Sequence, residues 1–167
     1  MQTLPEFFAH ALAIEDEAAA RYHELAALMI THHNQAVADV FARLAGYEAQ
    51  HAAKIREAAG EVQLPPIAPW EYRWEGFESP ESAPHDQVHY LMTPFHALEL
   101  ALINERLAHE FFVRIAASSK NPEIKRLARE MAVDEAHHVE LIREWLNRVE
   151  RPARDWADDP DPASEVD

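Results

Sequence analysis

Residues 47–55 read YEAQHAAKI, and residues 134–142 read DEAHHVELI. Both stretches contain the same polar pair, a glutamate followed three positions later by a histidine: Glu48 and His51, Glu135 and His138. On a helix, positions three apart lie on one face, so each pair presents its two side chains in the same direction. The pairs are therefore candidates for a shared site between helices.

Each pair interrupts an apolar helical face. Apolar residues recur at alternating spacings of four and three around both pairs, which predicts two helices that each bury one side. The first face consists of Val37, Phe41, Leu44, Glu48, His51, Ile55 and Ala58. The second consists of Ile124, Ala128, Met131, Glu135, His138, Ile142, Trp145 and Val149.

Two further apolar patterns each contain one lone glutamate, Glu15 within residues 4–29 and Glu105 within residues 98–115. The segments around them resemble each other, since AIEDEAAARYHELA at 13–26 parallels INERLAHEFFVRIA at 103–116. Each segment is followed by a helix with the Glu-x-x-His pair. The chain therefore looks like an internal repeat of two related halves.

Capping residues and prolines divide the chain into four expected helices. We expect them to run from Thr3 to about Thr31, from Asn34 to about Ala59, from Thr93 to about Ser118, and from Asn121 to about Arg151. Short links within each half predict two antiparallel hairpins. The proline-rich residues 61–92 predict one long crossover connection, and residues 152–167 a flexible acidic tail.

Two hairpins joined by a long crossover are typical of the ferritin-like four-helix bundle. We therefore predict an all-α fold, with one ferritin-like domain over residues 1–151. Low glycine content and recurring Ala, Leu, Glu and Arg favour the same class.

Composition excludes several functions. The chain has no cysteine, which rules out disulfides, iron–sulfur clusters and zinc–thiolate sites. Thirty acidic residues against fifteen basic ones give a formal charge of −15, which disfavours nucleic acid and anionic membranes as partners. No apolar run approaches the ~20 residues that span a bilayer, so we expect a soluble, cytoplasmic protein.

Four glutamates on buried helix faces require compensation. Burying an unpaired carboxylate costs several kcal/mol or forces protonation, and no Lys or Arg lies on these faces. At ~1.5 Å rise per residue, Glu15 and Glu48 lie roughly 26 and 23 Å from their hairpin turn. Glu105 and Glu135 lie roughly 22 and 23 Å from theirs, so all four can share one level. Two metal cations at that level would supply the missing charge.

These residues resemble those of the rubrerythrin group of ferritin-like di-iron carboxylate proteins. The resemblance covers roughly residues 4–150 and rests on Glu15, YEAQH at 47–51, Glu105 and DEAHH at 134–138. It implies two iron ions, with manganese or zinc as substitutes. It also implies bridging roles for Glu48 and Glu135, terminal roles for Glu15 and Glu105, and one iron for each of His51 and His138.

The chain departs from rubrerythrins in two respects. Without cysteine it cannot itself contain a rubredoxin module, so the resemblance implies a separate electron donor. The extra glutamate of the third rubrerythrin helix is also missing, because the positions three residues either side of Glu105 are Leu102 and Ala108.

The resemblance implies a rubrerythrin-like oxidative-stress reductase that reacts with hydrogen peroxide or dioxygen. A ferroxidase or iron-storage protein is the alternative; an oxygen-activating hydroxylase and a metal-free structural bundle rank lower. His109 could be an extra ligand and Tyr22 a hydrogen-bond or redox partner, although partial exposure and packing are their ordinary explanations.

Two expectations concern the remaining histidines and aromatic residues. We expect ordinary exposed histidines at the turns and in the crossover: His32, His33, His85, His89 and His96. Trp70, Tyr72 and Trp74 of the crossover suggest an interface in a homodimer.

Overall fold

The structure is a computed structural model that describes residues 3–68 and 91–153. It contains four α-helices, and the described residues include no strand. The helices are α1 (Leu4–Thr31), α2 (Gln35–Ala59), α3 (Pro94–Ser118) and α4 (Pro122–Leu146). The predicted all-α class is confirmed.

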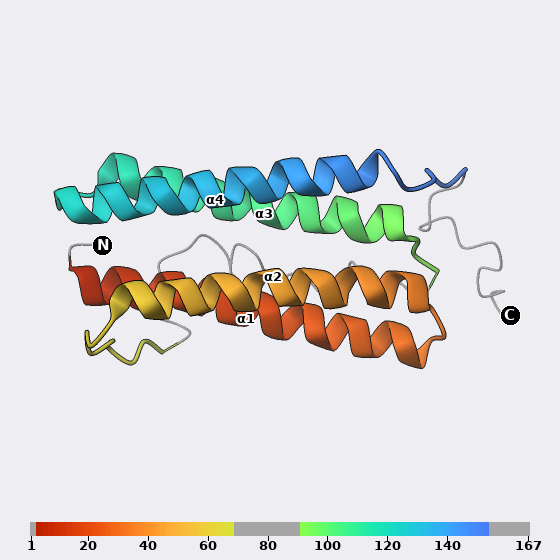
Figure 1. The fold of residues 1–167 in the computed structure, drawn as a ribbon, viewed down its shortest axis with the longest axis horizontal. Coiled ribbons are helices and arrows are strands. Elements are labelled where there is room, and N and C mark those ends of the chain that lie inside the picture. The colour runs from red at the N-terminus through yellow and green to blue at the C-terminus, as the bar shows by residue number, and fades with distance from the viewer. Residues whose placement is uncertain (1–2, 69–90, 154–167) are drawn as a thin grey trace, which may run out of the picture.

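The helices form two antiparallel hairpins that face each other (Figure 1). Residues 32–34 join α1 to α2, and residues 119–121 join α3 to α4. Helix α2 ends at one end of the bundle and α3 begins at the opposite end (Figure 1). This is the predicted ferritin-like arrangement.

Local capping explains where the helices begin. The Oγ1 atom of Thr3 accepts a hydrogen bond from the backbone N–H of Glu6 at 3.4 Å. The Oδ1 atom of Asn121 accepts one from the N–H of Glu123 at 2.9 Å. Each bond satisfies an amide group that the first helical turn leaves without a partner. At the other end of α2, Gly60 has a φ of 56°, a conformation that glycine adopts without steric cost.

Helix α4 ends five residues earlier than expected, at Leu146 rather than at about Arg151. The N–H of Arg148 instead bonds to the carbonyl of Trp145 at 2.9 Å, which closes a tight turn. Proline also disfavours helical geometry in the residue before it, and Pro152 follows Arg151 directly. The sequence pattern placed the helix end too close to this proline.

The expectation for His96 was also wrong. His96 lies in the first turn of α3 and is buried, whereas His32 and His33 are exposed as expected. Its Nδ1 atom accepts a hydrogen bond from the backbone N–H of Thr93 at 3.1 Å. His96 therefore caps a helix start, a role that the sequence reasoning assigned only to other residue types.

The apolar core consists of two clusters. One contains Tyr22, Leu25, Phe41, Leu98 and Ile142 among others. The other contains Phe7, Ile14, Ile55, Phe112 and Ile124 among others. Along every helix, the glutamates of interest fall between the residues of one cluster and those of the other. The core is therefore interrupted at the level of these glutamates.

Some predictions lie outside the described residues. These concern His85, His89, Trp70, Tyr72, Trp74 and most of the tail at 152–167. Within the described ranges, none of the helices combines the length and apolar character that crossing a membrane requires.

Asn34 generates a prediction about stability. Its Oδ1 accepts a hydrogen bond from the N–H of Val37 at 3.3 Å, and its Nδ2 donates one to the carbonyl of Met92 at 2.7 Å. Asn34→Ala removes both the cap and this tie to the end of the crossover, so we expect a loss of about 1–2 kcal/mol in urea unfolding. The neighbouring exposed Gln35→Ala is the control, and equal stability of the two variants would contradict this role.

Candidate metal centre

Six polar side chains converge between the two hairpins, one or two from each helix. The four glutamates are at most 1% exposed: Glu15, Glu48, Glu105 and Glu135. His51 is also buried, and His138 is half-buried. The helical repeat places them here because each occupies the inward face on which its apolar neighbours pack.

Each histidine lies close to two carboxylates: those beside His51 come from both hairpins, and those beside His138 come from the α3–α4 hairpin. The Nδ1 atom of His51 is 3.6 Å from Oε2 of Glu15 and 3.6 Å from Oε1 of Glu135. The Nδ1 atom of His138 is 3.1 Å from Oε2 of Glu105 and 3.8 Å from Oε2 of Glu135. Each histidine is therefore close to the lone glutamate of its own hairpin, as an internal repeat predicts, but both are also close to Glu135, which the repeat does not predict.

Three groups of potential ligand atoms occur in the described part of the chain, each with its atoms within 4.8 Å of one another. They are Glu15, His51 and Glu135; Glu105, Glu135 and His138; and Glu48, His51 and His138. Glu135 belongs to both groups that contain a lone glutamate. Glu48 is grouped with both histidines. The structure thus brings all six predicted residues together in two half-sites that share members.

The donor set fits metal ions. Both carboxylate oxygens of Glu15, Glu48 and Glu135 are buried and have no hydrogen-bond partner among the described residues. Buried polar groups normally have partners, and a buried carboxylate without one is costly. Carboxylate and imidazole groups are ligands for iron, manganese and zinc, so two cations here would satisfy these oxygens. This is the observation that a metal centre explains.

Without metal, burial shifts the carboxyl groups toward the protonated form. Burial raises the pKa of Glu15 from the usual 4.5 to about 7, with repulsion from Glu135 acting in the same direction and His51 opposing it. Burial also raises the pKa of Glu48 well above its usual value, assisted by repulsion from Glu15 and Glu135. The pKa of Glu105 is raised in the same way, by burial and then by Glu48 and Glu135.

The two histidines shift in opposite directions. Burial acts to lower the pKa of His51, but its interactions with Glu135 and Glu15 outweigh burial and raise the pKa to about 10. Burial lowers the pKa of His138 to about 4, and the positive charge of His51 contributes to this decrease. Their rings stack with centroids 4.2 Å apart, and two adjacent imidazolium charges would repel. Without metal, these shifts favour a protonated His51 beside a neutral His138.

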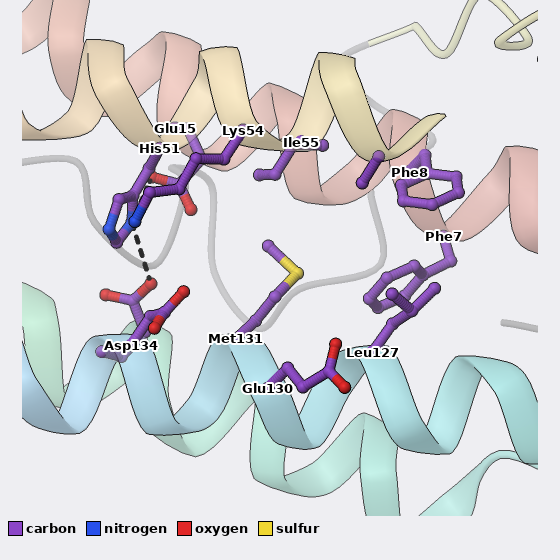
Figure 2. A pocket seen from close by; sticks show the side chains of 12 residues that line it. Phe7, Phe8, Glu15, His51, Lys54, Ile55, Leu127, Glu130, Met131 and Asp134 are labelled. Atoms are coloured by element: carbon purple, nitrogen blue, oxygen red, sulfur yellow. Dashed lines mark ion pairs between the residues drawn. The ribbon is translucent and has the colours of Figure 1, made fainter. Parts of the chain in front are cut away.

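A cavity of about 190 Å³ adjoins the cluster between the α1–α2 hairpin and α4. Glu15, His51 and Glu135 line it where it reaches the cluster, together with Lys54 and Asp134. Figure 2 shows Met131 pointing from α4 into the middle of this space, with Phe7, Phe8 and Leu127 at the end away from the cluster. Ala58 also lines the cavity and is exposed, although the apolar pattern predicted that it is buried.

Several neighbours of the centre were not foreseen from the sequence. Asn104, one residue before Glu105, is buried and donates a hydrogen bond to the hydroxyl of Tyr22 at 3.3 Å. Tyr22 also stacks on Phe41, with ring centroids 6.0 Å apart. An asparagine on a buried helix face is a signal that the sequence reasoning could have used. Tyr22 is thus placed by both packing and hydrogen bonding.

Other aromatic rings extend from the centre toward the surface. Tyr47 contacts His138 with centroids 5.9 Å apart, and it contacts Trp145 with centroids 6.0 Å apart. Trp145 lines a separate surface hollow near the end of α4. His109 is half-buried and belongs to none of the three ligand groups found among the described residues.

Comparison with known proteins gives the family. The family model described as rubrerythrin matches residues 6–146, with a second match over residues 96–159. The chain therefore belongs to the rubrerythrin family.

A solved structure supports the same fold. It is the crystal structure of an uncharacterized conserved protein from Magnetospirillum magnetotacticum MS-1, which is 40% identical in sequence with a TM-score of 0.70. The match covers 92% of this chain and 99% of that one. A search among curated proteins gave no match.

The raised carboxyl pKa values predict how stability of the metal-free protein depends on pH. Three glutamates bind protons more tightly in the folded than in the unfolded chain: Glu15, Glu48 and Glu105. Their contribution to the stability of the fold is therefore fully present below the usual carboxyl pKa of 4.5. It is lost as pH rises through the raised pKa values, and for Glu15 that pKa is about 7. His138 acts oppositely, because its stabilising contribution is lost as pH falls through about 4. His51, with its pKa raised to about 10, acts like the glutamates once pH exceeds its usual 6.5. Four groups therefore oppose one, so we expect the Tm of metal-free protein to fall between about pH 5 and about pH 7.

Metal should reverse this dependence, since it binds the deprotonated carboxylates. Thermal unfolding with chelator and with ferrous ion, under argon, measures both curves. A metal-free Tm that rises over the same interval would contradict the assignment. In metal-free Glu48→Gln, the decrease in Tm with rising pH should be smaller, because the variant lacks one of the carboxyl groups with a raised pKa.

Proposed function

We propose that this chain binds two iron ions between its hairpins and uses them to reduce hydrogen peroxide or dioxygen. The observation that supports this most strongly is the set of buried carboxylate oxygens without hydrogen-bond partners, beside two imidazoles. A chain of the rubrerythrin family with such a donor set has both the charge and the ligand chemistry for a di-iron centre.

The proposed ligand roles follow the grouping of the side chains. Glu15 and His51 serve one iron, and Glu105 and His138 serve the other, because each pair lies in its own hairpin. Glu135 is within reach of both pairs and would bridge the ions. Glu48, which is grouped with both histidines, would be the second bridge.

Two ferrous ions supply two electrons, which is the number that converts one hydrogen peroxide and two protons into two waters. The protein contributes by holding both sites in one buried volume, where the oxygens of Glu15, Glu48 and Glu135 have no competing hydrogen-bond partner among the described residues. The cavity beside Glu15, His51 and Glu135 gives the oxidant a path to the centre. Since the sequence contains no cysteine, we propose that a separate donor returns the electrons.

A ferroxidase or iron-storage role is the alternative, because the same centre oxidises ferrous ion when iron itself is the substrate. It requires a hollow multimeric shell and a mineral product, whereas a reductase can act as the small homodimer that we propose. An oxygen-activating hydroxylase and a metal-free bundle are weaker alternatives, and the second predicts protein without bound iron.

Metal content tests the ligand assignment. We expect about two iron ions per chain after anaerobic loading, measured by elemental analysis. Glu48→Ala and Glu135→Ala should each weaken iron affinity by more than ~10-fold, because they remove bridging ligands and not merely their supporting groups. Glu57→Ala, at an exposed position of α2, is the matched control. Equal iron content in all four proteins would show that iron binds elsewhere.

Reactivity tests the proposed reaction. Stopped-flow mixing of the loaded ferrous protein with hydrogen peroxide should oxidise both ions at least ~10-fold faster than free ferrous ion, which corresponds to ~1.4 kcal/mol of barrier lowering. Light scattering of the same sample distinguishes the alternative, since a large shell that mineralises added iron would favour storage. Oxidation no faster than in free solution would rule out the reductase.

A further inference from the structure

The cavity beside the candidate metal centre is larger and more apolar than hydrogen peroxide requires. Its volume is about 190 Å³. For comparison, an engineered apolar cavity of ~150 Å³ in another protein stays dry and binds benzene. The space here is therefore sufficient for one aromatic ring with a short substituent.

The two ends of the cavity differ in their lining: one end adjoins the proposed metal ligands, and the other is mainly apolar. Carboxylates and an imidazole of the proposed ligand set, Glu15, His51 and Glu135, form one end. Beyond Met131 and Ile55, the wall continues through Phe7, Phe8 and Leu127, with the exposed Glu130 beside Leu127 (Figure 2). Such a wall offers water few hydrogen bonds but offers an apolar ligand a large contact area.

The cavity also communicates with the surface. Lys54, Ala58 and Glu130 line it and are exposed. Lys54 and Ala58 lie on one side of α2, three and seven residues after His51. A small molecule can thus enter beside Ala58 and reach the cluster without unfolding the bundle.

We propose that this cavity binds small apolar organic hydroperoxides, with the hydrocarbon part among the aromatic and aliphatic side chains and the peroxide group at the metal centre. The proposal rests on the di-iron function above and specifies its substrate class. The O–O bond breaks, two electrons from two ferrous ions and two protons enter, and the products are one alcohol and one water. Both ions become ferric.

Binding to the metal-free protein provides a test that does not depend on iron. The probe is 2-phenyl-2-propanol, the alcohol that corresponds to cumene hydroperoxide, and binding is followed by ligand-observed NMR and calorimetry. Ala58→Trp places an indole at the entrance and should weaken binding by about tenfold, or ~1.4 kcal/mol. Ala53→Trp changes another exposed position of α2, one that does not line the cavity, and should bind like the parent.

Kinetics then link the cavity to the reaction. Ferrous protein is mixed with cumene hydroperoxide and, separately, with hydrogen peroxide. The ratio of the cumene hydroperoxide rate to the hydrogen peroxide rate should fall by about tenfold in Ala58→Trp, because the larger oxidant depends more on a wide entrance. Leu127→Trp, which narrows the apolar end, should lower the same ratio and provides a second variant if one is poorly folded.

The outcomes separate the two proposals. Weaker probe binding together with a lower ratio in Ala58→Trp supports the organic hydroperoxide assignment. Probe binding that is absent, or equal in Ala58→Trp and Ala53→Trp, overturns it even if hydrogen peroxide reacts rapidly. Specific probe binding with no oxidation by either peroxide overturns the reductase function and the hydroperoxide chemistry, and leaves only a site for apolar ligands.

Discussion

The whole bundle depends on four carboxylates enclosed in its middle, because their burial must be compensated by protons or by cations. Burial raises the pKa values of Glu15, Glu48 and Glu105, which shifts these groups toward the protonated form in the metal-free chain. Cations remove this cost by taking the place of the protons. Metal bound at the proposed centre would therefore turn groups that weaken the empty bundle into a connection between its two hairpins.

The bundle is built so that this polar level does not disrupt folding. Apolar clusters lie on both sides of it, one containing Phe41 and Leu98 and the other containing Phe7 and Phe112. Each cluster draws on both hairpins, so the hairpins are held together at two positions independently of metal. The centre can consequently stay short of hydrogen-bond partners, because packing on either side supports it.

The two half-sites are similar but not equivalent. Each hairpin supplies one lone glutamate and one Glu-x-x-His pair, yet His51 is stabilised as a cation and His138 as a neutral ring. His51, Glu15 and Glu135 also line the cavity, whereas Glu105 does not. The cavity therefore reaches the centre from the side of Glu15, His51 and Glu135. A small molecule can approach the approximately symmetric ligand set from that side.

The sequence by itself determined the four helices, their pairing into hairpins and the common level of the four candidate glutamate ligands. These features depend on local capping, on helical periodicity and on the fixed rise per residue, which act within one helix or one hairpin. Only the tertiary structure decided that Ala58 borders an open cavity, that Asn104 bonds to Tyr22, and that the pKa values of the two histidines shift in opposite directions. Those features depend on the lateral separation of helices, which is set by side-chain packing between segments far apart in the chain.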